Sequence, residues 1–201
     1  MQRARLALVV FCLAGVGLLA LQVLRHGPML ELDRDVSLWF AAHRHARLTQ
    51  FMLLVSDLHQ TVKVLAATVL LALWFGLRGD LRSARALLVV PAGMLLNVGL
   101  KDSFRRARPL VEDPLVQLAT YSFPSGHAVA STVFYGMACA LVFTHVRSRA
   151  LRAAAAAVAV AMVLLVTFSR VYLGAHYPSD VIAGVALGTA CVVLFLRFLR
   201  R

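Results

Sequence analysis

Six stretches of this chain are apolar for long enough to cross a lipid bilayer, and no other feature limits the fold as strongly. A membrane-spanning helix needs about 20 mostly apolar residues. Inside lipid the backbone must bond within its own segment, so continuous apolar stretches form helices. We therefore predict an all-α membrane protein with six transmembrane helices in a single domain, residues 1–201. The predicted spans are residues 6–24, 60–77, 84–100, 127–146, 150–170 and 179–197.

Composition supports membrane embedding. Hydrophobic residues make up 61% of the chain and charged residues 15%, whereas a soluble domain carries about 25% charge. The net charge of +12 would suggest nucleic acid in a soluble protein. Here, however, the basic residues occupy short loops between apolar spans and form no single stripe. The expected partner is the bilayer, and no nucleic-acid partner is expected.

The first apolar stretch is predicted to be a retained span. Arg3 and Arg5 precede residues 6–24, whereas a cleaved signal peptide has a shorter apolar core and a small-residue cleavage site. Between the first and second spans, residues 29–59 mix charged side chains with apolar ones at helical spacing. This pattern predicts helices lying in the membrane interface, and an ordinary helix covering a loop is the alternative.

The distribution of basic residues predicts the orientation. If both termini are cytoplasmic, the cytoplasmic loops and ends hold eleven Lys and Arg residues against one acid. The opposite side then holds ten basic residues and eight acids. Because cytoplasmic loops carry an excess of Lys and Arg, this bias predicts cytoplasmic termini.

Three polar stretches lie beside these apolar spans, and all fall on the extracytoplasmic side in this topology. They are residues 101–109 (KDSFRRARP), 124–127 (PSGH) and 169–180 (SRVYLGAHYPSD). Ionisable groups near lipid are costly and are retained for a function. Each motif alone is weak evidence, but the three together, in this order and on one membrane face, predict a common site.

The first and third stretches supply positive charge. Lys101, Arg108 and Arg170 are the predicted cradle for the phosphoryl oxygens of a phosphate ester, because Arg binds phosphate in a bidentate manner and Lys acts as a point charge. Arg105 and Arg106 are interpreted mainly as surface or headgroup contacts, with phosphate contact as the alternative.

The second stretch stands directly before the fourth span. Ser125 can cap that helix and Gly126 lets the backbone approach a ligand closely. The free N–H groups of a helix start then favour an anion. His127, in the first turn, is a candidate general acid.

The third stretch pairs a histidine with a carboxylate. His176 and Asp180 are four residues apart at the start of the sixth span, so Asp180 can turn back toward the imidazole. A carboxylate there fixes the tautomer and leaves the other ring nitrogen free to attack phosphorus. These residues alone do not separate nucleophile from acid with certainty, although Asp180 favours His176 as the nucleophile.

With these motifs in place, the chain resembles the type 2 phosphatidic acid phosphatase (PAP2) superfamily, whose motifs are K-x6-RP, PSGH and SR-x5-H-x3-D. No motif position departs from this pattern. The resemblance implies a metal-independent lipid phosphatase that needs no cofactor and forms a phosphohistidine. In it, His176 would be the nucleophile, Asp180 its partner, and His127 the acid that later activates water. The residues implied to hold the phosphate are Lys101, Arg108, Ser125, Gly126 and Arg170.

The substrate is predicted less narrowly than the reaction. The size and outward site resemble those of bacterial enzymes of the cytoplasmic (inner) membrane, and undecaprenyl pyrophosphate is the favoured lipid phosphate. The alternatives are a phosphatidylglycerophosphate, phosphatidic acid or lipid A phosphatase, and a lipid phosphotransferase. A non-enzymatic alternative is a binder or transporter of anionic lipids. The sequence leaves oligomeric state, lipid entry and the role of residues 25–60 open.

Overall fold

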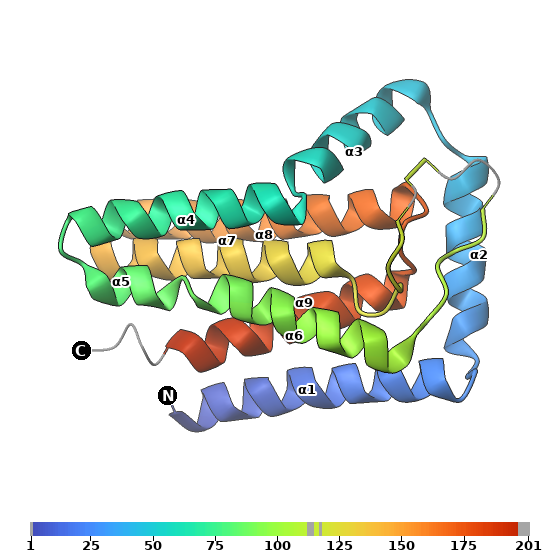
Figure 1. Cartoon of the computed structure of the whole chain (residues 1–201), viewed down its shortest axis with the longest axis horizontal. Coiled ribbons are helices and arrows are strands. Elements are labelled where there is room, and N and C mark those ends of the chain that lie inside the picture. The colour runs from blue at the N-terminus through green and yellow to red at the C-terminus, as the bar shows by residue number, and fades with distance from the viewer. Residues whose placement is uncertain (1, 112–114, 117, 197–201) are drawn as a thin grey trace.

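The computed structural model describes residues 2–111, 115, 116 and 118–196. In that part of the chain the regular structure is helical throughout, as predicted (Figure 1). The helices are α1 (Gln2–Leu24), α2 (Met29–Ala42), α3 (Ala46–Leu58), α4 (Thr61–Leu77), α5 (Leu81–Ala86), α6 (Val89–Phe104), α7 (Gly126–His145), α8 (Arg149–Tyr172) and α9 (Pro178–Phe195). The last position of the predicted sixth span, residue 197, lies outside the described residues.

The number of spans is close to the prediction. Among the described residues, five helical segments are long and apolar enough to cross a membrane: α1, α5 with α6, α7, α8 and α9. The predicted second span corresponds to α4, which has 17 residues. A sixth span is obtained if α3 and α4, which meet at a 50° bend, are counted as one broken span.

The predicted third span is broken near its proline. Pro91 has no N–H group to donate to the carbonyl of Leu87, so the helical hydrogen-bond ladder is interrupted there. The chain accordingly separates α5 from α6 at Leu87 and Leu88, and the N–H of Val90 bonds the Leu87 carbonyl at 3.0 Å. The helix is thus interrupted one turn before Pro91.

Helix α7 is the centre of the bundle and contacts α4, α6, α8 and α9. Its side chains Val129, Val133 and Met137 are fully buried in the main apolar core. Two glycines allow α9 to approach α7 closely. A Cβ atom at Gly184 would lie 2.7 Å from the Ala128 Cβ, and one at Gly188 would lie 2.7 Å from the Thr132 Cβ. The starts of α7 and α9 are therefore held side by side.

One end of the bundle gathers the polar stretches. There α6 and α8 end and α7 and α9 begin, while α1 begins and α9 ends at the opposite end (Figure 1). The predicted helices of residues 29–59 are present as α2 and α3, and α2 crosses the polar end of the bundle (Figure 1). Because α2 contacts α8 and α9 while α3 contacts α8, both helices can reach residues of that end.

Candidate active site

The three polar stretches meet around one cavity. Its volume is about 290 Å³, and its walls come from the start of α4, the C-terminal half of α6, the loop after α6, the start of α7 and the α8–α9 loop. The predicted site residues that line it are Lys101, Arg108, Gly126, His127 and His176. Lys101 and His176, which are 75 positions apart in sequence, are thus brought to one cavity, whereas Ser125, Arg170 and Asp180 are not among its lining residues.

His176 lies in the loop between α8 and α9 and is 1% exposed. Its Nδ1 atom is 3.5 Å from the Asp180 Oδ2 atom and 3.4 Å from the hydroxyl of Ser122. Its Nε2 atom faces the other way, 3.3 Å from the Arg108 Nη1 atom. The imidazole therefore presents Nε2 to the cavity residues, with a carboxylate behind the opposite nitrogen.

Asp180 is fixed by three donors besides His176, one of which is the Arg106 guanidinium. Asp180 occupies the first turn of α9, which begins at Pro178 as predicted. The Tyr177 N–H donates to Oδ2 at 2.9 Å, and the Ser122 hydroxyl donates to the same oxygen at 2.5 Å. Ser122 is fully buried but lies outside every motif, so the sequence carried no signal for it. Its hydrogen bond holds the carboxylate where it faces the imidazole.

Lys101 and Arg108 are at present bonded to the loop that follows α6. The Lys101 ammonium donates to the carbonyls of Tyr121 and Ser122. The Arg108 Nε and Nη2 atoms donate to the carbonyl and hydroxyl of Thr120, and its Nη1 atom donates to the Ala175 carbonyl at 2.6 Å. Both cations are thereby oriented at the cavity wall by backbone acceptors.

Arg170, His127 and Ser125 differ, because each has a buried polar atom without a hydrogen-bond partner in the described structure. These atoms are Arg170 Nε and Nη2, His127 Nε2 and Ser125 Oγ. Buried polar groups nearly always have partners, and leaving them unpaired is costly. A guanidinium, an imidazole and a hydroxyl with unused bonding capacity fit an oxyanion. Ser125 stands at the N-cap position of α7, yet its side chain makes no capping bond.

Electrostatics favour a neutral His176. Burial lowers the pKa of the His176 imidazole to about 3, although the Asp180 carboxylate offsets part of this effect. Burial also lowers the pKa of the Arg108 guanidinium from its ordinary value, and an arginine remains a cation at neutral pH. The site thus joins an uncharged imidazole to a fixed positive charge. Among the described residues, no group of three or more His, Cys, Asp or Glu side chains is placed to hold a metal ion.

Arg106 corrects a prediction. It was interpreted as a surface or headgroup contact, but it is 8% exposed and its guanidinium is ion-paired with Asp180 at 2.6 Å and Asp33 at 2.8 Å. Arg105 is exposed and donates to the Asp102 carbonyl. It caps α6 with a left-handed backbone, φ 46°, so the next residue turns inward. Because of this turn, Arg105 points to the surface and Arg106 is buried, although the sequence predicted the same role for both.

Helix α3 also reaches the site through a residue that the sequence analysis missed. The Ser56 hydroxyl accepts a hydrogen bond from Arg170 Nη1. Ser56 is 114 residues from Arg170, and no local pattern marks it. One residue of α3 therefore orients an arginine of the site.

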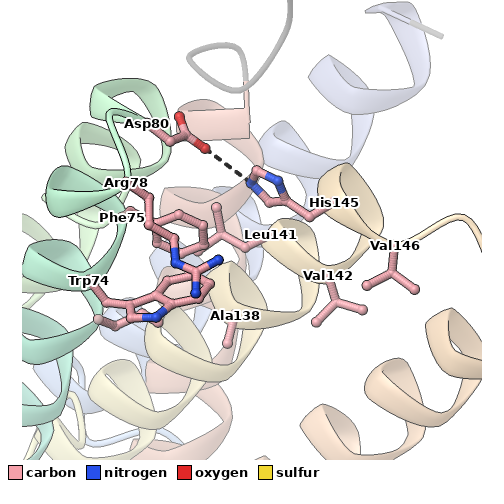
Figure 2. Close-up of a pocket in the computed structure, with 10 residues that line it drawn as sticks. Trp74, Phe75, Arg78, Asp80, Ala138, Leu141, Val142, His145 and Val146 are labelled. Atoms are coloured by element: carbon pink, nitrogen blue, oxygen red, sulfur yellow. Dashed lines mark ion pairs between the residues drawn. The ribbon is translucent and has the colours of Figure 1, made fainter.

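A larger hollow of about 570 Å³ lies near the opposite end of α4 and α7. Figure 2 shows Asp80 paired with His145 at 3.2 Å and the Arg78 guanidinium near Trp74. Asp80 caps α5 by accepting from Ser83. None of the predicted site residues lines this hollow, whereas five of them line the smaller cavity.

The fold and this cavity define a multi-pass helical membrane protein in which histidine, arginine and lysine side chains gather at one cavity. Residues 82–201 match the family model of the PAP2 superfamily. Because this match covers more than half of the chain, the protein belongs to the PAP2 superfamily. The membership expected from the three motifs is confirmed.

Individual relatives agree with this assignment. The chain is 36% identical to phosphatidylglycerophosphatase B of Bacillus subtilis over 51% of its length and 50% of that protein. It is 33% identical to a protein named "Probable lipid phosphate phosphatase beta" of Arabidopsis thaliana, over 87% of the chain and 92% of that protein. The matches to the first curated relatives span about half or less of those proteins' lengths.

A crystal structure supports the architecture. It is described as the first transmembrane PAP2 type phosphatidylglycerolphosphate phosphatase from Bacillus subtilis. The TM-score is 0.85 at 28% identity, and the match covers 96% of this chain and 94% of that one. The helical arrangement, including the segment before residue 82, is therefore shared with a solved family member.

Proposed function

We propose that this protein hydrolyses the terminal phosphate of a membrane lipid through a covalent phosphohistidine on His176. The observation that carries the proposal is the arrangement of His176: Nδ1 faces Asp180 at 3.5 Å, while Nε2 lies at the cavity beside Arg108. A neutral imidazole oriented by a carboxylate is an activated nucleophile. The roles below remain predictions that the named experiments test.

In the first half-reaction, the lone pair of His176 Nε2 attacks phosphorus. The new P–N bond forms as the P–O bond to the lipid breaks. The His127 Nε2 atom, which is buried and unpartnered in the described structure, then supplies the proton that the leaving oxygen takes. Asp180 stabilises the positive charge that develops on the His176 ring. The products of this step are a free lipid and phosphohistidine.

In the second half-reaction, water replaces the histidine on phosphorus. His127, now deprotonated, accepts a proton from the attacking water. The P–N bond breaks and its electron pair returns to Nε2 of His176. Inorganic phosphate leaves, and both histidines regain their starting protonation states.

Positive charge stabilises the phosphoryl oxygens in both steps. Arg170 has two unpartnered nitrogens and would bind these oxygens directly. Arg108 and Lys101 would exchange some of their carbonyl contacts for phosphate oxygens, and Gly126 with Ser125 would present the start of α7. Preorganised cations and dipoles of this kind commonly make the largest contribution to phosphoryl transfer.

The cavity also suits a substrate with an apolar part. Its wall includes Met94, Val98 and Leu118 beside the cationic groups. Two substrates lead: undecaprenyl pyrophosphate, which the sequence analysis favoured, and phosphatidylglycerophosphate, which is named for the first relative and for the matched crystal structure. A lipid A or phosphatidic acid phosphatase and a phosphotransferase share the same chemistry.

We further propose that the protein resides in a bacterial cytoplasmic membrane with its site on the extracytoplasmic face and both termini in the cytoplasm. The support is the excess of arginine in the loops at the end opposite the site and the positive-inside rule. A reporter protein that functions only in the cytoplasm should be active when it is fused to either terminus. An extracytoplasmic terminus would overturn this orientation.

The reaction is tested with purified protein in detergent and a panel of lipid phosphates and pyrophosphates compared by kcat/KM. We expect phosphate release in the presence of a metal chelator, and inhibition by vanadate, a five-coordinate mimic of the transition state. An absolute need for added divalent metal would contradict the metal-independent mechanism. Lipid binding without phosphate release would indicate a binder or transporter, and phosphate transfer to an added alcohol would indicate a phosphotransferase.

The pH dependence tests the state of His176. A histidine with an ordinary pKa of about 6.5 would be mostly protonated at pH 5, which would lower kcat/KM about 30-fold. Because burial lowers the pKa of His176 to about 3, the neutral nucleophile persists and no such loss is expected between pH 7 and pH 5. The substrate phosphate has a second pKa of about 6. Its titration is measured separately, so that its effect on kcat/KM can be told from that of His176. A tenfold loss per pH unit below 6.5, recovered on return to pH 7, would contradict a neutral His176.

A further inference from the structure

Asp180, the partner of His176, is itself held by a buried ion-pair network. Its other charged members, Arg106 and Asp33, are not signature positions of the three motifs. The Asp180 Oδ1 atom accepts from Arg106 Nη1 at 2.6 Å, while Oδ2 accepts from Ser122 and the Tyr177 N–H. The two oxygens thus have separate partners. Arg106 binds the oxygen that faces away from His176, which leaves the other oxygen to face the ring.

The same guanidinium is bound on its other side by a carboxylate from α2. Arg106 Nη2 donates to Asp33 Oδ2 at 2.8 Å, and Asp33 Oδ1 accepts from the Ser179 N–H at 3.0 Å. Asp33 is 2% exposed and Arg106 is 8% exposed. Arg106 also lies over the Tyr177 ring at 4.2 Å. Neither Asp33 nor Arg106 lines the site cavity, and Arg106 bonds Asp180 directly, so we expect their effect on the reaction to pass through Asp180.

We propose that Arg106 and Asp33 are positioning residues for the reaction, which hold the Asp180 carboxylate in place and keep its negative charge available to His176. This inference rests on the proposed function. Attack by His176 creates an imidazolium that Asp180 stabilises. Without Asp33, the positive charge of Arg106 would neutralise Asp180 and repel that imidazolium. The negative charge of Asp33 balances the positive charge of Arg106. The pair therefore fixes the position of Asp180 and leaves the negative charge of Asp180 available to stabilise the His176 imidazolium.

This role explains why α2 crosses the end of the bundle. Its residue Asp33 bonds the start of α9 and the arginine that binds Asp180. Buried charges are tolerated where they are paired and hydrogen-bonded, and each of these charges has such partners. The segment 29–59 therefore contributes to the chemistry without touching the lipid phosphate.

The test uses Asp33→Asn, which keeps the side-chain shape and removes one negative charge. We expect kcat on the best lipid of the panel to fall about 10–100-fold, by analogy with the loss when a hydrogen-bond partner of a metal ligand is removed, with KM nearly unchanged. Arg106→Gln should behave in the same way. The matched controls are Asp35→Asn and Arg105→Gln, which alter exposed neighbours of the same type and should retain wild-type kcat.

A double-mutant comparison separates positioning from a general structural role. In an Asp180→Asn background, adding Asp33→Asn or Arg106→Gln should cause no further loss of kcat, because the residue through which they act has already lost its charge. Additive losses, or a loss confined to KM, would overturn the inference. Melting temperature and elution volume identify variants that fail to fold. If Arg106→Gln fails to fold, Arg106→Lys replaces it. Lysine keeps the positive charge but cannot bridge two carboxylates as the forked guanidinium does.

The outcomes also distinguish this inference from the proposed function. If the wild-type protein releases no phosphate from any lipid in the panel, the proposed function fails. If the wild type is active, His176→Ala is inactive and the Asp33 and Arg106 variants turn over at the wild-type rate, only the positioning inference fails.

Discussion

Replacing His176 with alanine should reduce phosphate release at least about 10⁴-fold, because the variant has no atom to form the P–N bond. Losses of that size follow removal of a nucleophile in other covalent enzymes. Lipid binding should persist, because the cations Lys101, Arg108 and Arg170 remain. The measurement is the single-turnover rate with the best lipid of the panel, together with lipid affinity.

Controls separate lost chemistry from lost folding. His145→Ala removes a histidine at the opposite end of α7, where it pairs with Asp80, and should leave the rate unchanged. His176→Asn keeps a polar side chain in the loop and should be as inactive as His176→Ala. Radiolabelled phosphate should appear on the wild-type protein in rapidly quenched reactions, in an acid-labile and base-stable form. Wild-type turnover in a folded His176→Ala protein would exclude the covalent mechanism.

Replacing His127 with alanine should reduce turnover of an alkyl phosphate about 10²–10⁴-fold, the range attributed to general acid catalysis. An alkoxide is a poor leaving group that needs a proton, whereas a nitrophenolate is stable at neutral pH. The loss should therefore be much smaller for the first half-reaction with nitrophenyl phosphate. The measurement is the ratio of the burst rates of the wild type and His127→Ala for the two esters.

The same variant should also release phosphate slowly, because His127 activates water in the second step. Phosphohistidine should therefore accumulate in His127→Ala when nitrophenyl phosphate is the substrate. Ser131→Ala is a suitable control, since Ser131 lies one turn further along α7 and bonds only the Ala128 carbonyl. Equal losses for both esters, with no accumulation of phosphoenzyme, would show that His127 is not the acid.

The helices and their approximate bounds were predictable because the length of an apolar stretch is a property of consecutive residues. Residues 127–146 were predicted as a span, and α7 covers Gly126–His145. The break before Pro91 was predictable for the same reason, since a missing N–H group acts on its own turn. The count of six spans was harder to predict, because α4 has 17 residues and forms a sixth span only when it is counted together with α3 across their bend.

The main site residues were predictable because their spacing is itself local. Asp180 lies in the first turn of α9 with His176 just before it, and Gly126 and His127 begin α7, so both placements follow from where these helices start. The roles of Arg105 and Arg106 were not predictable in this way. A left-handed residue at the end of α6 turns one outward and the other inward, and adjacent arginines carry no sequence signal for that difference.

By itself, the sequence determined that this is a helical membrane protein, and it predicted that its three polar stretches form one site for an oxyanion. Periodicity, apolar length and motif spacing report only on residues that are close in sequence. Helix formation and the placement of the motifs at helix ends depend on such residues. Only the tertiary structure decided what holds the site together. Asp33 is 146 residues from Ser179, Ser56 is 114 from Arg170, and Ser122 is 58 from Asp180. The contacts of Asp33 and Ser56 exist because α2 packs on α8 and α9 and α3 packs on α8, whereas the loop between α6 and α7 brings Ser122 to Asp180. Buried charges and polar groups there must find partners wherever the fold places them.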